Sequence, residues 1–330
     1  MIDRLARLRS PALYQGGDTD RRYFEGWYFK AVGGEGRRAV AVIPGVSFSA
    51  DARAAQAFVQ IIREGGGTRF FSYPAAAFSF ARRPPFAISV AGSTFTEQGM
   101  NLDLSDAEGE VRGSVGFGPW SPWPVTARAP GIMGWYRYVP RMECYHGVLS
   151  LDHAVDGCLT IDGERLDFGG GRGYIEKDWG RSFPSSWVWA QSNHFARPGV
   201  SLTCSVARIP WFSGGFVGHI AGLLIDGRLL RFATYTGAWL AELETGPGSF
   251  RVVLRDHSRE LEVRASGGVT GALKAPVLGA MEGRADEAIG GALWLRLREL
   301  RGWRAVTVFE GVGVHAGIEV MNERGDLDVG

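Results

Sequence analysis

One stretch of the sequence has two acidic residues at alternate positions, with an aromatic residue on either side. Residues 174–184 read Tyr-Ile-Glu-Lys-Asp-Trp-Gly-Arg-Ser-Phe-Pro. If this stretch forms a strand, Tyr174, Glu176 and Asp178 lie on one face, with the two carboxylates about 7 Å apart. Two carboxylates that close separate their pKa values, so one stays protonated near neutral pH and can act as a general acid. A solvated turn of alternating charges is the alternative interpretation.

A third acidic residue lies among aromatics at residues 23–30, Tyr-Phe-Glu-Gly-Trp-Tyr-Phe-Lys. In a strand, Glu25 and Trp27 share one face and Tyr28 lies on the other. A carboxylate between large aromatic residues lies either at a rim or in a pocket that raises its pKa. Glu25 is therefore a further candidate acid, and an edge-strand glutamate paired with an arginine is the alternative.

Amide side chains follow two tryptophans in residues 187–195. Alternation places Trp189, Gln191 and Asn193 on one face of this stretch. Amides on an otherwise aromatic face suggest hydrogen bonds to a phenol or carbonyl in an apolar pocket. A satisfied amide network in the core is the alternative.

Residues 142–153 bring a thiol and an imidazole to one strand face. Cys144 and His146 share that face, and Tyr145 lies on the other. The pair could act as a thiol nucleophile or bind a metal, but no third and fourth ligand are evident, so we expect no metal site. We interpret His146 as a pocket residue that hydrogen-bonds or shuttles a proton.

Turn residues punctuate almost the whole chain at intervals of about 8 to 12 residues, which is the rhythm of an all-β protein. Helical periodicity is weak, and the best helix candidates are residues 1–10 and 51–57. This pattern disfavours a doubly wound nucleotide-binding fold and predicts an antiparallel meander in two barrels or one large sandwich. Strands are expected at residues 38–43, 58–63, 86–90, 144–151, 159–161, 187–195, 201–209, 219–225, 250–254, 261–265, 293–300 and 305–309.

Length and charge limit the possible classes of function. The 330 residues suit two domains, which we place at residues 1–168 and 169–330. The net charge of +1 provides no field that would steer the protein onto a polyelectrolyte. We therefore expect no nucleic-acid partner and at most peripheral contact with a membrane.

The cysteines and the N-terminal sequence indicate the compartment. Cys144, Cys158 and Cys204 show no paired spacing, which supports neither a disulfide framework nor a CxxC metal knuckle. The first residues contain several charges and no apolar run long enough for a signal peptide. No stretch of the sequence approaches the roughly 18 apolar residues of a membrane helix. We expect a cytoplasmic protein that holds a hydrophobic small molecule inside its fold, and the oligomeric state stays open.

Three motifs together resemble the tocopherol cyclase family: residues 23–30, 174–184 and 187–193. Weaker similarity continues through residues 273–276 and 316–319. The family closes the chromanol ring of vitamin E from a prenylated hydroquinone without a redox cofactor. Its broader relatives, the carotenoid hydratases and lipocalin-like pericyclases, have two calycin barrels with a ligand cavity. The resemblance therefore implies an all-β fold of two lipocalin-like antiparallel barrels or half-barrels with few short helices.

The first hypothesis is a cofactor-independent cyclase, in which a buried acid protonates the prenyl alkene and the phenol oxygen traps the cation. Asp178 is the expected acid, with Glu176 or Glu25 as the runner-up. The plant enzymes of the family have asparagine where this chain has Asp178, which could strengthen an acid or mark a different substrate. The expected substrate-binding residues are Trp27, Tyr28, Tyr145, His146, Tyr174, Trp179, Trp189, Gln191 and Asn193.

Two other functions fit the same residues. A non-catalytic carrier of an isoprenoid or quinol would use the carboxylates only structurally, bind its ligand tightly and tolerate replacement of Asp178. A hydratase would add water to the same cation, which needs only an additional water site. The residues alone do not separate the hydratase from the cyclase.

Overall fold

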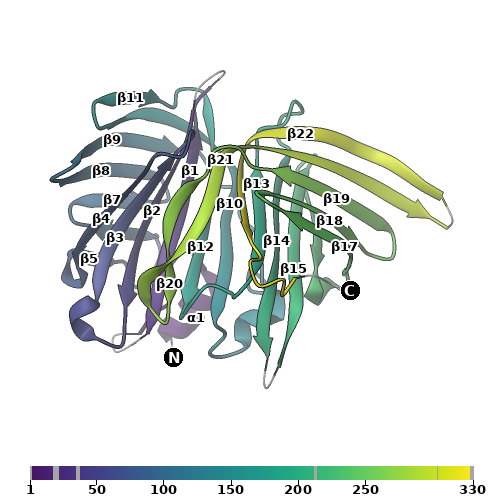
Figure 1. Ribbon diagram of the computed structural model, residues 1–330, viewed down its shortest axis with the longest axis horizontal. Coiled ribbons are helices and arrows are strands. Elements are labelled where there is room, and N and C mark those ends of the chain that lie inside the picture. Colours follow the sequence, from purple (N-terminus) through teal and green to yellow (C-terminus); the bar gives the residue numbers. More distant parts are fainter. Residues whose placement is uncertain (1, 18–21, 35–37, 212–213, 303, 328–330) are drawn as a thin grey trace. The chain divides into compact units, whose positions relative to one another are not determined.

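The chain folds almost entirely into antiparallel strands (Figure 1). The computed structural model describes residues 2–17, 22–34, 38–211, 214–302 and 304–327. Within these residues the helical elements are short, and the predicted all-β class is confirmed. They are α1 (Ile2–Arg9) and the 3-10 turns η1 (Ala52–Ala54), η2 (Ala75–Ala77), η3 (Gly134–Tyr138) and η4 (Thr234–Thr236).

The described residues form two compact units. The first contains the chain up to Arg63, then Gly67–Phe183 and Leu273–Arg284. The second contains Glu64–Gly66, Pro184–Ala272 and the residues from Ala285 onward.

The main change from the first unit to the second therefore falls after Phe183 and not after residue 168. The physical reason is strand pairing. Strand β12 (Gly171–Gly180) pairs along its length with β1 (Tyr23–Val32), so residues 171–180 belong to the first sheet.

The first sheet has the strand order β4-β3-β2-β1-β12-β10-β9-β8-β7-β6-β5, and β11 pairs with β10 at the side. The path follows the chain as a meander except where β12 inserts between β1 and β10. The remaining strands of this sheet are β2 (Ala39–Phe48), β3 (Gln56–Arg63), β4 (Thr68–Pro74), β5 (Phe78–Phe80), β6 (Ala87–Val90), β7 (Ser93–Thr96), β8 (Gly99–Asp106), β9 (Gly109–Phe117), β10 (Cys144–Ile161) and β11 (Glu164–Asp167).

The second sheet has the order β16-β15-β14-β13-β22-β21-β19-β18-β17, and β20 pairs with β21. Here β22 inserts between β13 and β21, as β12 does in the first sheet. The strands are β13 (Trp187–Ser192), β14 (Ser201–Trp211), β15 (Gly214–Ile225), β16 (Arg228–Ala233), β17 (Trp239–Gly246), β18 (Ser249–Arg255), β19 (Arg259–Ser266), β20 (Gly271–Val277), β21 (Ala280–Arg301) and β22 (Arg304–Met321).

Two local expectations differ from the structure. Residues 51–57 contain only the turn η1 before β3 begins, so no α-helix forms there. The strands expected at residues 144–151 and 159–161 are one strand, β10. It stays continuous because register shifts between Val148 and His153 bend it without breaking its pairing with β12.

Each unit has its own hydrophobic core on one face of its sheet. In the first unit the core includes Trp27, Phe29 and Ile175. In the second it includes Val188 and Ala190 on β13. Because side chains alternate along a strand, the residues between these core positions point to the opposite face of each sheet. The candidate functional side chains lie at such positions.

Candidate active site

Strand β12 carries polar side chains on both faces of the first sheet. Ile175 belongs to the core, so Lys177 and Trp179 share the core face with it. Tyr174, Glu176 and Asp178 point to the other face, which we call the carboxylate face. The structure thus has the alternation that the sequence predicts, and it brings these three residues together.

His146 completes this group from the neighbouring strand. Strand β10 pairs with β12 so that His146 lies directly opposite Asp178. The imidazole Nδ1 is 2.9 Å from Asp178 Oδ1, and Nε2 is 3.7 Å from Glu176 Oε2. The hydroxyl of Tyr174 donates a hydrogen bond of 2.5 Å to the same Glu176 oxygen. Four polar side chains therefore form one cluster on the carboxylate face, in which two hydrogen bonds are linked by the 3.7 Å contact between His146 and Glu176.

The four side chains of this cluster differ in their exposure to solvent. The side chain of Asp178 is 26% exposed and that of His146 is 17% exposed, whereas Glu176 keeps 7%. Tyr174 is fully buried. A ligand on this face would meet Asp178 and His146 first, with Glu176 and Tyr174 behind them.

Cys144 lies beside the cluster and is a poor nucleophile. Its Sγ is 3.9 Å from Asp178 Oδ1. Burial, reinforced by the nearby charge of Asp178, raises the pKa of the Cys144 thiol well above its ordinary value. Because the thiolate is the nucleophilic form, a thiol with a raised pKa is inert near neutral pH.

The same group offers donor atoms to a metal ion. His146, Glu176 and Asp178 each present one ligand atom, and these atoms lie within 4.8 Å of one another. A nitrogen with two carboxylate oxygens suits several divalent cations. The spacing of Cys144 and His146 does not indicate this set of ligands, because both carboxylates come from another strand.

One expected substrate-binding residue and one further residue lie on strand β1 beside this cluster. Tyr28 of β1 is opposite Glu176 in the register and is nearly buried. Lys30, which the sequence does not single out as a site residue, is opposite Tyr174 and is also buried. The position of Lys30 on the same face as Glu176 follows from the strand register and is not visible in the sequence.

Glu25 lies on the core face, away from Glu176 and Asp178. It forms a fully buried ion pair with Lys177, with Oε1 and Nζ 2.5 Å apart. The carboxylate also accepts hydrogen bonds from Tyr23 Oη and from the backbone N–H groups of Gln15 and Gly16. The partner is a lysine of the adjacent strand and not the arginine considered from sequence.

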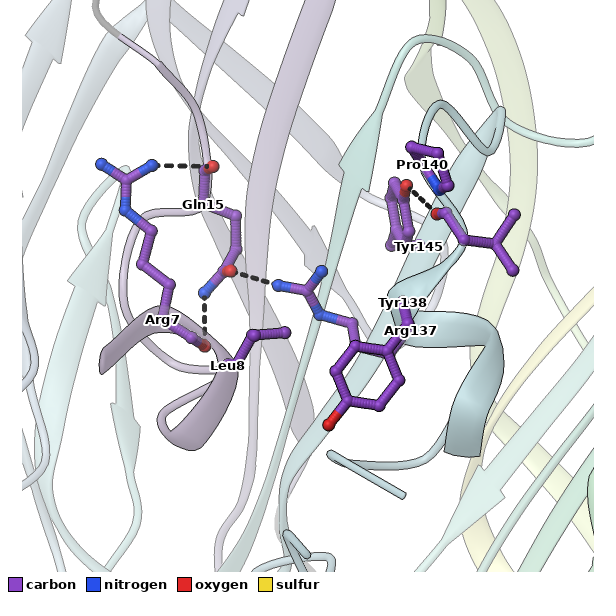
Figure 2. Close-up of a pocket in the computed structure, with 8 residues that line it drawn as sticks. Arg7, Leu8, Gln15, Arg137, Tyr138, Pro140 and Tyr145 are labelled. Carbon is purple, nitrogen blue, oxygen red and sulfur yellow. Dashed lines mark hydrogen bonds between the residues drawn. The ribbon is translucent and has the colours of Figure 1, made fainter. Parts of the chain in front are cut away.

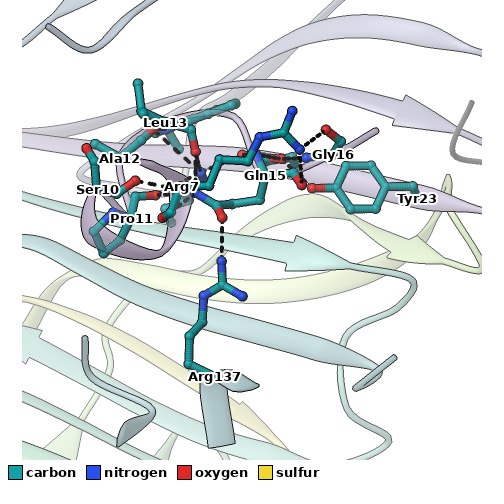
Figure 3. A network of polar contacts seen from close by, with 12 residues as sticks. Arg7, Ser10, Pro11, Ala12, Leu13, Gln15, Gly16, Tyr23 and Arg137 are labelled. Atoms are coloured by element: carbon teal, nitrogen blue, oxygen red, sulfur yellow. Dashed lines mark hydrogen bonds and ion pairs between the residues drawn. The ribbon is translucent and has the colours of Figure 1, made fainter. Parts of the chain in front are cut away.

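The N-terminal segment, whose residues 10–16 are shown in Figure 3, is the other partner of this ion pair. Lys177 Nζ donates to the backbone oxygens of Pro11 at 3.0 Å and Leu13 at 2.6 Å. Burial lowers the pKa of Lys177 to about 8, against the raising effect of Glu25. The geometry gives Glu25 and Lys177 the task of holding residues 11–16 against the core face.

Three of the expected aromatic residues of the first unit, Trp27, Tyr145 and Trp179, lie on the core face. Lys177 Nζ lies 4.5 Å from the ring centroid of Trp27 and 5.0 Å from that of Trp179. Tyr145 stacks on Trp179, with centroids 5.5 Å apart and an interplanar angle of 8°. Alternation along β1, β10 and β12 puts these three rings on the opposite face from Asp178, so the structure does not bring them to the carboxylate face.

Trp189, Gln191 and Asn193 belong to the second unit. Val188 and Ala190 are core residues, so Trp189 and Gln191 point to the other face of that sheet, where both are buried. Asn193 follows the end of β13, and its Oδ1 lies 2.9 Å from His194 Nδ1.

Solved structures with a similar fold define the class. A putative AttH from Nitrosomonas europaea matches with a TM-score of 0.55 and 14% identity, over 92% of this chain and 94% of that one. CghA with Sch210972 matches with a TM-score of 0.56 and 12% identity, over 90% and 88%. Kievitone hydratase from Nectria haematococca matches with a TM-score of 0.51 and 11% identity over the same shares. The chain has the two-sheet, lipocalin-like fold of this class.

The sequence then places the chain within a family. The family model for tocopherol cyclase-like proteins matches residues 90–321, and the chain belongs to that family. A probable chloroplastic tocopherol cyclase of Oryza sativa subsp. japonica is 26% identical over 184 residues, which is 54% of this chain and 38% of the relative. The chloroplastic tocopherol cyclase of Zea mays is 26% identical over 183 residues, 54% and 37% of the two chains. The matched stretch thus spans less than two fifths of these relatives.

In the part of the chain that the structure describes, no helix is both long and apolar enough to cross a membrane.

Proposed function

We propose that the protein is a cyclase that protonates the prenyl alkene of a prenylated hydroquinone and closes a chromanol ring. The observation that carries the proposal is the cluster of Asp178, hydrogen-bonded to His146, with Glu176 3.7 Å from the other imidazole nitrogen, in a chain of the tocopherol cyclase-like family. Such a cluster can hold a proton, deliver it and take it back, which is what an intramolecular cyclisation requires.

Asp178 is the acid in this proposal, because its side chain is the most exposed of the three. Its carboxyl proton passes to the less substituted alkene carbon, and a C–H bond forms as the carbon–carbon double bond opens. With its proton on Nδ1, His146 donates to Asp178 Oδ1 and stabilises the carboxylate that remains. Glu176 Oε2 lies 3.7 Å from the other imidazole nitrogen, where it can accept a proton from the ring once His146 is doubly protonated.

Ring closure follows from the tertiary cation. The phenol oxygen forms a C–O bond to the cationic carbon, and the phenol proton returns to the cluster, so the product is an isomer of the substrate. Tyr28 lies on the same face opposite Glu176, and its ring can shield the cation.

A hydratase is the second candidate. The observation in its favour is the exposure of Asp178, at 26% of its side chain, which leaves room for a water molecule beside the acid. Water would then capture the same cation in place of the phenol, and the product would gain one water.

The test is anaerobic incubation of the purified protein with a phytylated dimethylhydroquinone and shorter-tailed analogues, followed by mass spectrometry and chromatography against authentic chromanol. A product of unchanged mass that elutes with the chromanol supports the cyclase. A gain of one water supports the hydratase and overturns the cyclase. Recovery of bound but unaltered substrate overturns both and favours a carrier.

A further inference from the structure

A cavity of about 380 Å³ opens beside the N-terminal helix of the first unit (Figure 2). Its lining combines arginine, amide and phenol groups with aliphatic side chains, and no lining residue carries a carboxylate. The lining residues are Arg7, Leu8, Gln15, Arg137, Tyr138, Val139, Pro140 and Tyr145. A cavity of this composition suits a ligand with an anionic end and an apolar body.

Arg137 is fixed in place by the aromatic stack behind it. Its guanidinium carbon lies 4.9 Å from the ring centroid of Trp179 and 5.4 Å from that of Tyr145. The same guanidinium donates a hydrogen bond to Gln15 Oε1. An arginine held over stacked rings and by a hydrogen bond is pre-organised, so little side-chain entropy remains to be lost when its N–H groups bind an oxyanion.

Arg7 approaches the same glutamine from the helix. It donates to the backbone oxygens of Gln15 at 3.2 Å and Gly16 at 2.7 Å. These acceptors are neutral, and among the side chains that the structure describes no carboxylate lies within ion-pair distance of Arg7. Figure 2 shows both guanidinium groups directed toward Gln15 from opposite sides.

The electrostatics of this region favour an anion. After burial and Glu25, the groups that act on the pKa of Lys177 are Arg137 and Arg7, and both lower it. Arg7 and Arg137 thus both repel the positive charge of Lys177, which is paired with Glu25. A dianion in the cavity would offset the repulsion among them.

We propose that this cavity binds a phosphate monoester, with the phosphate at Arg7 and Arg137 and the organic group against Leu8, Val139 and Pro140. The site is separate from the proposed cyclase site, because Tyr145 and Trp179 lie on the core face and Asp178 on the carboxylate face. Guanidinium groups bind phosphate oxygens through paired, charge-assisted hydrogen bonds.

The test is isothermal titration calorimetry of the full chain at constant ionic strength, at a pH above the second phosphate pKa of about 6. Phenyl phosphate, inorganic phosphate, benzoate and phenol are the probes. We expect saturable one-to-one binding in the order phenyl phosphate, inorganic phosphate, benzoate, with no binding of phenol. Tighter binding of benzoate than of phenyl phosphate overturns the phosphate assignment, and inorganic phosphate binding as tightly as the ester overturns the role of the apolar lining.

Variants locate the binding site. Arg7→Gln and Arg137→Gln should each weaken phenyl phosphate binding by about tenfold or more. Arg165→Gln, at an exposed position of β11, is the matched control and should leave binding unchanged. Leu8→Trp fills the cavity without removing a charge and should abolish binding, with thermal unfolding showing that each variant is folded. Absence of saturable phosphate binding by the wild type, or equal affinity in the wild type and Leu8→Trp, overturns the proposal.

Discussion

His146 Nδ1 lies 2.9 Å from Asp178 Oδ1, across the antiparallel pair of β10 and β12. The two residues are 32 positions apart in the chain, and only the register of these strands brings them together. This contact joins the most exposed carboxylate of the cluster to an imidazole that also faces Glu176. In the proposed reaction these three groups together hold, deliver and take back the proton.

Asp178→Asn should abolish turnover and leave ligand binding nearly intact. The amide keeps the size and a hydrogen bond to His146, but it cannot donate a proton to an alkene. General acid catalysis contributes about 10²- to 10⁴-fold, so kcat should fall by at least about 100-fold. Steady-state kinetics and equilibrium binding of the substrate measure the two effects.

The matched control for this variant is Asp103→Asn. Asp103 is an exposed aspartate of the same sheet, and its side chain is 68% exposed beside Arg112. This control should retain wild-type kcat and stability. Full activity in Asp178→Asn would remove Asp178 from the acid role.

His146→Gln and Asp178→Asn should have strongly non-additive effects on kcat. Residues that act as one unit lose most of the activity when any member is removed, so the double variant should be little worse than Asp178→Asn alone. A double-mutant cycle on kcat measures the coupling. Additive losses would show that the imidazole acts independently of the acid.

The sequence predicts the faces of the strands better than their partners. A strand repeats every two residues, so the sharing of one face by Tyr174, Glu176 and Asp178 follows from spacing alone. The contact of His146 with Asp178 depends instead on the register of β10 against β12. That register includes shifts near Ser150 that no local pattern specifies.

Glu25 illustrates the same limit on the core face. Its position among aromatics is visible in the sequence, and it fits either a pocket acid or a paired structural residue. Glu25 is a paired structural residue because Lys177 of another strand forms an ion pair with it and the backbone N–H groups of Gln15 and Gly16 donate hydrogen bonds to its carboxylate. These contacts form only when the N-terminal segment crosses the core face, and a long-range crossing of that kind has no sequence signature.

Lys177→Met should destabilise the protein strongly. Lys177 and Glu25 are both fully buried, and removing the lysine leaves an uncompensated carboxylate and takes one hydrogen-bond donor away from the backbone oxygens of residues 11–13. Breaking a buried pair in this way costs about 3–5 kcal/mol in the free energy of unfolding. Urea denaturation monitored by tryptophan fluorescence measures the loss.

An exposed ion pair gives the comparison. Arg38 and Glu164 are paired at 3.0 Å, with side chains 63% and 44% exposed. Arg38→Met should therefore cost no more than about 1 kcal/mol. Equal losses in the two variants would contradict the structural role given to the Lys177 and Glu25 pair.

His153 should make the protein sensitive to acid. Burial, with a smaller effect of Arg172, lowers the pKa of His153 from 6.5 to about 4. Between these two values the unfolded state binds more protons, so stability rises with pH from about 4 to 6.5 and is lost as the pH falls through this window. The loss attributable to His153 is about 3 kcal/mol.

Chemical denaturation at a series of pH values checks this expectation. His153→Gln should show a shallower loss of unfolding free energy between pH 6.5 and pH 4 than the wild type, because the glutamine does not titrate. His257→Gln replaces an exposed histidine and serves as the control. Identical pH profiles for the wild type and His153→Gln would contradict the assignment.

Product formation in D₂O tests the central claim most directly, because it follows the proton from the cluster into the product. The wild type is incubated anaerobically with the phytylated dimethylhydroquinone in D₂O, and the chromanol is analysed by mass spectrometry and NMR. The account predicts one non-exchangeable deuterium at the carbon that was the less substituted end of the alkene, and no product from Asp178→Asn. Chromanol without deuterium at that carbon, or equal deuterated product from Asp178→Asn, would contradict it.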